Sequence, residues 1–268
     1  MPKVKIEPSH CSSMALRDIL HSFRNGDISM EEAERALRMD YIEKVNGHTV
    51  FDHSRKIRKD VPEVVYALSK TPETVAEIAK RVPEDGYLLI SRASEDHYRA
   101  VKKAVRGNVV RYHDVASVIS VGKTPDVKKK GKIGILTAGT SDIGVAEEAR
   151  LMAETMGCAC MTSYDVGVAG VHRVLEPMKE MLNEDVDSII VIAGMEGALP
   201  SLVASLSSVP VIGVPASTGY GYGGKGEAAL MCMLQTCSPG LAVVNIDNGI
   251  GAAAMAVMIS RQRWKKDE

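Results

Sequence analysis

The sequence predicts an α/β protein whose second half is a doubly wound, flavodoxin-like sheet of five parallel strands. After residue 131, apolar runs alternate regularly with helix-like segments. The run at residues 188–193 (SIIVIA) does not alternate in polarity, as expected for a strand that helices cover on both faces. Aromatic residues make up only 4% of the chain while aliphatic ones are abundant, which favours such a core over a β-sandwich.

Five strand–helix units follow one another in this half. We expect strands near residues 132–137, 159–164, 187–193, 210–214 and 241–246. Helices are expected near residues 141–156, 169–182, 197–206, 224–236 and 250–261. Right-handed crossovers would join these strands into one sheet, in which ligands bind at the carboxyl ends of the strands.

The first half reads as a smaller accessory α/β domain, residues 1–122, joined through a lysine-rich linker, 123–131, to the domain of residues 132–268. A helical hairpin opens it, with Ser29 and Glu32 forming a capping box. The predicted helices are 14–23, 29–39, 71–81, begun by Thr71-Pro72, and 94–105, capped by Ser94. Strands are expected near residues 49–52, 87–90 and 109–112.

Bulk composition excludes several classes of protein. The net charge of −1 gives no reason to expect nucleic acid or an anionic membrane as a partner. Five cysteines in 268 residues argue against a disulfide framework, and Cys158 and Cys160 are too close for the usual zinc pair. Neither a leader-like apolar segment nor an apolar window of membrane-spanning length occurs, so a cytoplasmic protein is expected.

Two of the predicted strand ends carry groups that suit phosphate. Gly139, Thr140, Ser141 and Asp142 follow the first strand and open a helix, which predicts an anion site, ordinary helix capping by Ser141 or Asp142, or both. After the second strand come Asp165, His172 and Arg173. His172 and Arg173 fit proton transfer and phosphate binding, although a lone histidine is more often a surface or capping residue.

The next two strand ends carry a carboxylate and a glycine-rich loop. Glu196 stands among small apolar residues, where it should act as a base, bind a metal or pair with a cation. The glycine-rich loop, residues 217–226, contains Lys225 and the spacing Gly219-x-Gly221-x-x-Gly224. This spacing begins five residues after the strand and lies in the fourth unit. It therefore indicates a flexible nucleotide-contacting loop rather than a dehydrogenase fingerprint.

Cys237 closes the helix-like run that follows this loop and precedes the fifth strand. A thiol between a glycine-rich loop and a strand could be a nucleophile facing a bound nucleotide. A buried structural cysteine is the alternative, because cysteine also behaves as a small hydrophobic residue.

Several motifs together resemble the LarB family, whose catalytic half is similar to PurE, the aminoimidazole ribonucleotide (AIR) carboxylase/mutase. The motifs are residues 134–142 (GILTAGTSD), 165–173 (DVGVAGVHR), 194–200 (GMEGALP) and 244–249 (VNIDNG), with 51–58, 62–65 and 70–73 in the first half. The resemblance implies a PurE-like catalytic domain. The chain departs from PurE in two places. It has Glu196-Gly-Ala-Leu-Pro200 where that family usually has an Ala-His-Leu-Pro stretch, and Thr236-Cys237-Ser-Pro239 where it usually has Met-Pro.

The resemblance implies carboxylation of nicotinic acid adenine dinucleotide by CO₂ at C5 of its pyridinium ring. Release of AMP would leave pyridinium-3,5-biscarboxylic acid mononucleotide, for nickel-pincer cofactor synthesis. Cys237 would be the nucleophile, and Glu196 or His172 would remove the C5 proton. Phosphate would be held by Ser141, Asp142 and the N–H groups after Gly139, with Lys225 or Arg173 as countercharge.

Asp142, Asp165 or Glu196 could share a Mg²⁺ ion, whereas neither biotin nor ATP is expected. The resemblance also implies a homo-oligomer, from a dimer to an octamer. Two other functions stay open at this point. One is an AIR carboxylase or mutase of purine synthesis, and the other is a non-enzymatic nucleotide-binding regulator.

Overall fold

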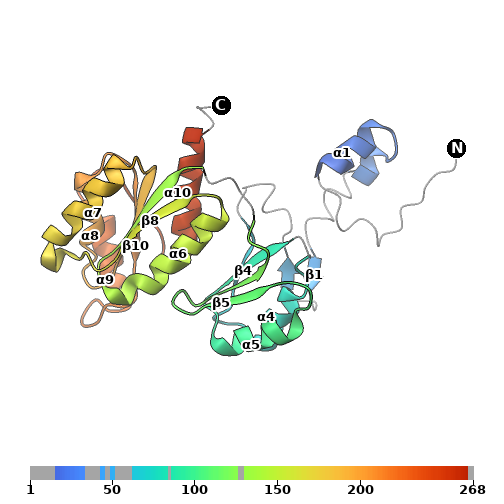
Figure 1. Cartoon of the computed structure of the whole chain (residues 1–268), viewed down its shortest axis with the longest axis horizontal. Helices are drawn as coiled ribbons and strands as arrows, with labels where there is room; N and C mark the ends of the chain where they lie inside the picture. The colour runs from blue at the N-terminus through green and yellow to red at the C-terminus, as the bar shows by residue number, and fades with distance from the viewer. Residues whose placement is uncertain are drawn as a thin grey trace. The chain divides into compact units, whose positions relative to one another are not determined.

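The computed structural model describes residues 16–33, 43–45, 49–51, 62–83, 86–125 and 130–264 (Figure 1). The chain divides into two compact units, Met1–Glu63 and Val64–Glu268. The predicted domain boundary at 123–131 stays a prediction, and residues 126–129 of that linker lie outside the described residues.

The first unit contains the helix α1 (Leu16–Arg24) and the antiparallel strands β1 (Glu43–Val45) and β2 (Thr49–Phe51). The predicted capping box is confirmed. The Ser29 N–H donates to Glu32 Oε2 at 2.8 Å, and the Glu32 N–H donates to Ser29 Oγ at 3.1 Å. The remainder of this predicted helix after residue 33, and residues 52–58 of the LarB-like motif, lie outside the described residues.

The second unit begins with a four-stranded mixed sheet. In space its order is β3 (Val64–Tyr66), β4 (Tyr87–Ser91), β6 (Val118–Gly122) and β5 (Val110–His113). The helices α4 (Pro72–Ala79) and α5 (Glu95–Ala104) pack against each other beside it. Their predicted caps are confirmed: the side chain of Thr71 accepts from the Thr74 N–H at 3.3 Å, and that of Ser94 from the His97 N–H at 3.4 Å.

The second half forms the predicted doubly wound sheet. Its strands are β7 (Lys132–Thr137), β8 (Ala159–Ser163), β9 (Ser188–Ala193), β10 (Val211–Pro215) and β11 (Leu241–Val243). All pair in parallel in the order β11-β10-β9-β7-β8. The helices are α6 (Ile143–Thr155), α7 (His172–Asn183), α8 (Leu199–Leu206), α9 (Glu227–Leu234) and α10 (Gly249–Trp264), with short 3₁₀ turns η2 (Thr140–Asp142) and η3 (Val168–Gly170).

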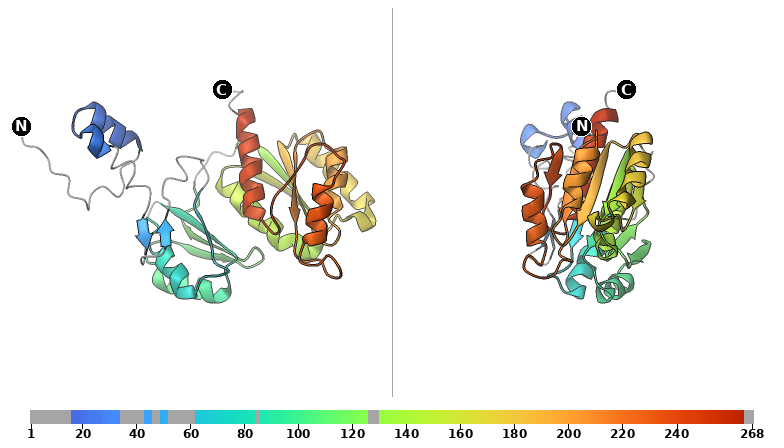
Figure 2. Two further views of the ribbon diagram at one scale, coloured as in Figure 1. Left: turned by 180° about the vertical axis from the view of Figure 1, so that it is seen from behind. Right: turned by 90° about the vertical axis from the view of Figure 1, so that its left-hand side faces the viewer.

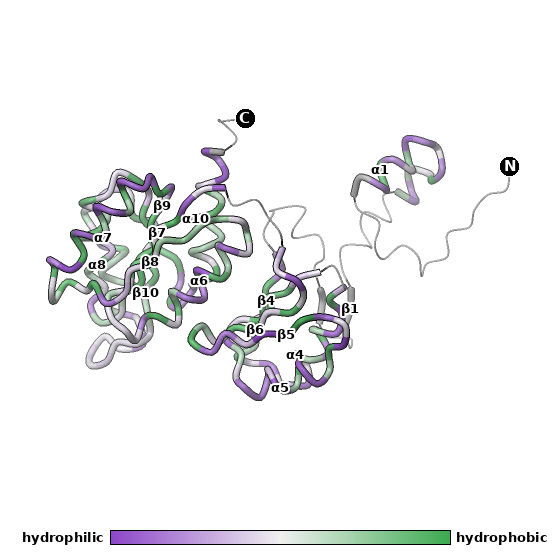
Figure 3. Tube along the Cα trace, in the orientation of Figure 1, coloured by the Kyte–Doolittle hydropathy of each residue, from purple (hydrophilic) through white to green (hydrophobic). Residues whose placement is uncertain are grey.

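Helices cover both faces of this sheet, which explains why its strands are apolar without alternation (Figures 2 and 3). On one face, α7, α8 and α9 contribute to a core with β7, β9 and β10. The helices α6 and α10 pack together on the other face. Every residue of β9 is buried. In the described part of the chain, no helix has the length and apolar character needed to cross a bilayer.

Because the strands are parallel, the sheet has two chemically different edges. The loops that follow strands, such as 138–142, 194–198 and 216–226, meet at what we call the carboxyl edge. The loops that precede strands, such as 184–187 and 235–240, lie at the opposite amino edge. Side chains on these two sets of loops are separated by the length of the strands.

Candidate active site

Asp142 joins two loops of the carboxyl edge. Its Oδ2 accepts from the Gly139 N–H at 2.9 Å, and its Oδ1 accepts from Thr218 Oγ1 at 2.7 Å. The residue is only 2% exposed. Both carboxylate oxygens are therefore engaged within the protein, and Asp142 cross-links the loop after β7 to the glycine-rich loop. The neighbouring Thr140 and Ser141 are exposed residues at the start of η2.

Asp165 and Arg173 form an ion pair at the end of β8. Arg173 Nη1 lies 2.8 Å from Asp165 Oδ2 and donates to the Asp165 carbonyl at 2.6 Å. Asp165 has φ +58°, and its N–H donates to Thr137 Oγ1 at 3.1 Å. Such an exposed pair contributes about 1 kcal/mol or less to stability, so an incoming phosphate can compete for the guanidinium. His172 is exposed at the first position of α7.

Glu196 projects from a tight turn after β9. The Gly197 N–H donates to the Gly194 carbonyl at 2.8 Å, and Met195 and Gly197 have φ of +45° and +67°. A Cβ on Gly197 would lie 2.6 Å from the Cα of Ala229 on α9, so the close approach requires glycine.

This turn bears on the three roles predicted for Glu196, which were to act as a base, to bind a metal or to pair with a cation. The Glu196 side chain is exposed to solvent, and no residue that the structure describes forms a hydrogen bond or ion pair with it. The carboxylate is consequently available to a ligand at the carboxyl edge. The roles of base and metal ligand stay predictions.

The glycine-rich loop packs against the Glu196 turn through backbone atoms. A Cβ on Gly219 would lie 2.9 Å from the Met195 nitrogen, and one on Gly194 would lie 2.5 Å from Thr218 Oγ1. Further along the loop, Gly221 has φ +81° and space around it, whereas Gly224 closes a turn by donating to the Gly221 carbonyl at 3.2 Å. Glycine thus permits both the contact between loops and the turn itself.

This loop also presents three large side chains to solvent. Lys225 is exposed with φ +57°, and its role as a countercharge stays a prediction. Tyr220 and Tyr222 are 80% and 111% exposed. No role was predicted for these two tyrosines, although they alternate with glycine in the sequence. Their rings offer faces on which a planar ring can stack.

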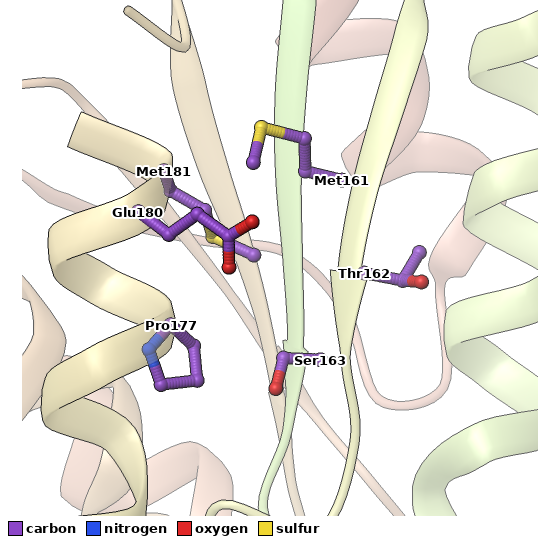
Figure 4. A pocket seen from close by; sticks show the side chains of 6 residues that line it. All are labelled: Met161, Thr162, Ser163, Pro177, Glu180 and Met181. Atoms are coloured by element: carbon purple, nitrogen blue, oxygen red, sulfur yellow. The ribbon is translucent and has the colours of Figure 1, made fainter. Parts of the chain in front are cut away.

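Two other features of the described residues bear on the predicted site. No three His, Cys, Asp or Glu side chains of that part of the chain gather as a metal-binding group, so Mg²⁺ stays a prediction. A hollow of about 280 Å³ lies between β8 and α7 (Figure 4). It is lined by Met161, Thr162, Ser163, Pro177, Glu180 and Met181, none of which belongs to the predicted site.

Cys237 is exposed, but it lies at the amino edge rather than near the glycine-rich loop. The helix α9 runs from that loop back along the sheet (Figure 2). Cys237 follows α9 and precedes β11, whose Leu241 pairs with Val211 at the start of β10. The five residues of β10 span about 16 Å at about 3.3 Å per residue. The interpretation that the thiol faces the glycine-rich loop of its own chain is therefore wrong, as is the alternative of a buried cysteine.

A flavodoxin-like sheet with hydroxyl, charged and glycine-rich loops at its carboxyl edge places the chain in the class of α/β proteins whose ligands bind at that edge. Residues 132–266 match the AIR carboxylase family, and residues 42–123 match the LarB/PurE-like N-terminal domain. The chain belongs to the LarB family and has a PurE-like domain, which confirms the resemblance read from its motifs. Membership of this carboxylase and mutase group indicates an enzyme.

Relatives of two kinds match the chain. An uncharacterised protein of Methanocaldococcus jannaschii is 44% identical and is covered over 97% of its length by 92% of this chain. The N5-carboxyaminoimidazole ribonucleotide mutase of the same organism is 36% identical over 47% of this chain and 77% of its own length. The mutase of Thermotoga maritima is 32% identical over 48% of this chain and 74% of its own length.

Proposed function

We propose that this protein carboxylates nicotinic acid adenine dinucleotide at C5 of the pyridinium ring and then hydrolyses the phosphoanhydride. The products are AMP and pyridinium-3,5-biscarboxylic acid mononucleotide, a precursor for nickel-pincer cofactor synthesis. The observation that carries the proposal is an exposed thiol, Cys237, in a chain of the LarB family. The stretch from Glu196 to Pro200, which stands where PurE usually has Ala-His-Leu-Pro and contains no histidine, is a second departure from the purine enzyme.

The chemistry follows from the electron demand of the ring. A pyridinium ring is electrophilic, so its C5 does not attack CO₂. When the Cys237 thiolate forms a bond to a ring carbon beside C5, the ring becomes a dihydropyridine in which C5 has enamine character. C5 then forms a bond to CO₂. Loss of the C5 proton and departure of the thiolate restore the aromatic ring, with no net oxidation or reduction.

The described residues of the carboxyl edge supply the other groups that this reaction requires. Glu196 is exposed and unpaired with any described residue, which suits a base that accepts the C5 proton, with His172 as the alternative. Arg173, Lys225 and the Ser141 hydroxyl are candidates for binding the phosphates. Tyr220 and Tyr222 offer stacking surfaces for the pyridinium or adenine ring. A Mg²⁺ ion would polarise the anhydride for attack by water.

A complete site of this kind needs two copies of the chain. The sulfur forms its bond to one ring carbon, and the base removes a proton from the adjacent ring carbon. Both groups must therefore lie within a few ångströms of the same part of the ring. Within one chain Cys237 and Glu196 lie on opposite edges, about 16 Å apart by strand length alone. The proposal therefore assigns Glu196 to one protomer and Cys237 to a neighbouring protomer of a homo-oligomer.

Exposed apolar side chains support this assembly. Beside Cys237, Met231 and Leu234 of α9 are each 66% exposed. Met195, next to Glu196, is 45% exposed, so apolar surface lies near both halves of the site. Apolar surface of this kind marks contacts with other molecules when it is contiguous. A second copy would bury it while bringing the thiol to the carboxylate.

Labelled bicarbonate separates the three candidate functions. The protein is incubated with nicotinic acid adenine dinucleotide or with aminoimidazole ribonucleotide, and mass spectrometry follows the label, the intact protein and AMP. We expect label in the pyridinium product, release of AMP and a thiol adduct on the protein. Label in the imidazole alone would identify a purine enzyme, and tight nucleotide binding without turnover would identify a regulator.

A further inference from the structure

A buried carboxylate connects the four-stranded sheet to the five-stranded sheet. Glu148 on α6 is 2% exposed, and its Oε1 accepts from Ser91 Oγ at 2.6 Å at the end of β4. Arg92 Nε lies 3.7 Å from the same oxygen. Burial raises the pKa of Glu148, although Ser91, Arg92 and the backbone N–H groups of residues 249 and 250 act in the opposite direction. The carboxylate therefore joins β4 to the start of α10.

Arg92 is held in an uncommon backbone conformation at this point. Its φ is +57°, in the left-handed region that residues other than glycine rarely adopt. The flanking residues are fixed by backbone hydrogen bonds, from Ala67 to the Ser91 carbonyl at 2.9 Å and from Ala93 to the Ser117 carbonyl at 2.8 Å. When the surrounding structure holds a residue in the left-handed region, this points to a functional reason for the direction of its side chain.

The Arg92 side chain reaches the residue that fixes the start of the glycine-rich loop. Arg92 Nη2 donates to the backbone carbonyl of Asp247. Asp247 Oδ1 accepts from the Ser217 N–H at 2.8 Å, and the Asp247 N–H donates to the Pro215 carbonyl at 2.7 Å. The next residue, Thr218, donates to the buried Asp142. One series of hydrogen bonds thus runs from β4 to both cross-linked loops of the carboxyl edge.

We propose that Arg92 is a positioning residue: by holding Asp247, it fixes where the glycine-rich loop begins. Positioning this loop is then one function of the four-stranded sheet, whose strand β4 Arg92 directly follows. A guanidinium can hold the Asp247 carbonyl and face the Glu148 carboxylate at once, because its donors spread in a planar fork. The kinetic part of this inference rests on the proposed function. The structural part does not, since it concerns loop order in the protein without substrate.

Hydrogen exchange of the full-length protein tests the structural part. We expect amides of residues 217–226 to exchange roughly tenfold faster in Arg92→Ala, the scale of a lost charge-assisted hydrogen bond. Arg92→Gly separates the contact from the backbone strain, because glycine accepts the left-handed conformation without a side chain. It should relieve the backbone strain, lose the same contacts as Arg92→Ala and show the same faster exchange.

Arg99→Ala is the matched control. Arg99 belongs to the same sheet-and-helix segment and is well exposed; among the described residues its ion-pair partners are Glu95 and Asp96 of its own helix, at 2.8 and 3.5 Å. Its exchange in residues 217–226 should equal that of the wild type. Unchanged exchange in both Arg92 variants would overturn the proposal, as would equal acceleration in Arg99→Ala.

The kinetic part predicts a specific pattern. In Arg92→Ala and Arg92→Gly, KM for the dinucleotide should rise roughly tenfold while kcat changes by less than about twofold, because the loop binds rather than reacts. Arg92→Lys should recover part of the affinity, since an ammonium can donate one hydrogen bond to the Asp247 carbonyl. Faster exchange with unchanged KM would overturn the positioning role. Absence of turnover in the wild type would contradict the proposed function and leave the exchange result to decide this inference.

Discussion

The two edges of the five-stranded sheet use polar residues in different ways. At the carboxyl edge, Asp142 cross-links loops while Glu196, Lys225 and the hydroxyl of Ser141 remain exposed. At the amino edge, Asp187 is buried and accepts from the Lys132 N–H at 3.0 Å, from Ser260 Oγ and from Arg263 at 3.2 Å. The exposed polar groups of the carboxyl edge are accessible to a ligand. At the amino edge, the hydrogen bonds of Asp187 connect β7 and β9 to α10.

Cys237 is the exception at the amino edge, since it is exposed and lies outside this structural network. A second thiol at that edge shows the contrast. Cys158, which precedes β8, is fully buried. If Cys237 is the proposed nucleophile, its target has to come from another molecule, as the proposed two-chain site requires.

The largest expected effect concerns Cys237→Ala. Loss of the nucleophile should reduce carboxylation and AMP release at least about 10³-fold, because no adduct can form. The midpoint of thermal unfolding should stay unchanged, since the side chain is exposed. Cys232→Ala, a neighbouring and partly exposed thiol on α9, should keep its activity. Comparable activity in Cys237→Ala would contradict the covalent mechanism.

Thiol labelling distinguishes the two cysteines of the amino edge. Burial raises the pKa of Cys158 to about 11, so at pH 8 its thiolate is roughly 10²-fold scarcer than that of an ordinary cysteine with a pKa of about 8.5. Iodoacetamide followed by peptide mapping should therefore modify Cys237 readily and Cys158 only after unfolding. The dinucleotide should protect Cys237. Faster modification of Cys158 than of Cys237 would refute this contrast.

Asp187→Ala tests the structural use of the amino edge. It leaves the buried Ser260 hydroxyl and the Lys132 N–H without their acceptor, so the free energy of unfolding should fall by about 2–4 kcal/mol. Asp185→Asn is the control, because Asp185 is an exposed partner of the same Arg263. Its effect should stay below about 1 kcal/mol in denaturant unfolding. Equal effects of the two substitutions would show that the buried contacts of Asp187 stabilise the fold no more than an exposed ion pair does.

The smallest effect is expected at the cross-link of the carboxyl edge. Thr218→Val removes the hydroxyl that donates to Asp142, which should lower the free energy of unfolding by about 1 kcal/mol. It should also raise KM several-fold, because the glycine-rich loop loses one attachment. Thr218→Ser retains the hydroxyl and should restore both quantities. A valine variant with wild-type stability and KM would show that the cross-link has no role.

Much of the fold was readable from the sequence because its strands are long apolar runs. The strand predicted at 132–137 has those bounds in the structure, and that predicted at 187–193 begins one residue later. The prediction of 241–246 was too long, since β11 pairs with β10 over only three residues. Strands β1 and β3 were missed because three residues give little periodicity. The five-residue β6 was missed although all of its residues are buried.

The site was only partly predictable. Sequence order correctly assigned Glu196 and the glycine-rich loop to the carboxyl edge, because both follow strands. The same rule would have assigned Cys237 to the amino edge, because it follows a helix and precedes a strand. The exposure of Glu196 depends on the positive φ of Met195, and the role of Asp142 depends on a contact with Thr218, 76 residues away. Neither feature leaves a local pattern in the sequence.

Mixing two inactive variants tests the two-chain site most directly. Cys237→Ala and Glu196→Gln are purified separately, dissociated, mixed in equal amounts and reassembled. If one protomer supplies the carboxylate and its neighbour the thiol, roughly a quarter of the sites in the mixture contain both, and about that fraction of wild-type carboxylation returns. Activity that stays at the level of the separate variants, in oligomers shown to contain both chains, would contradict the account.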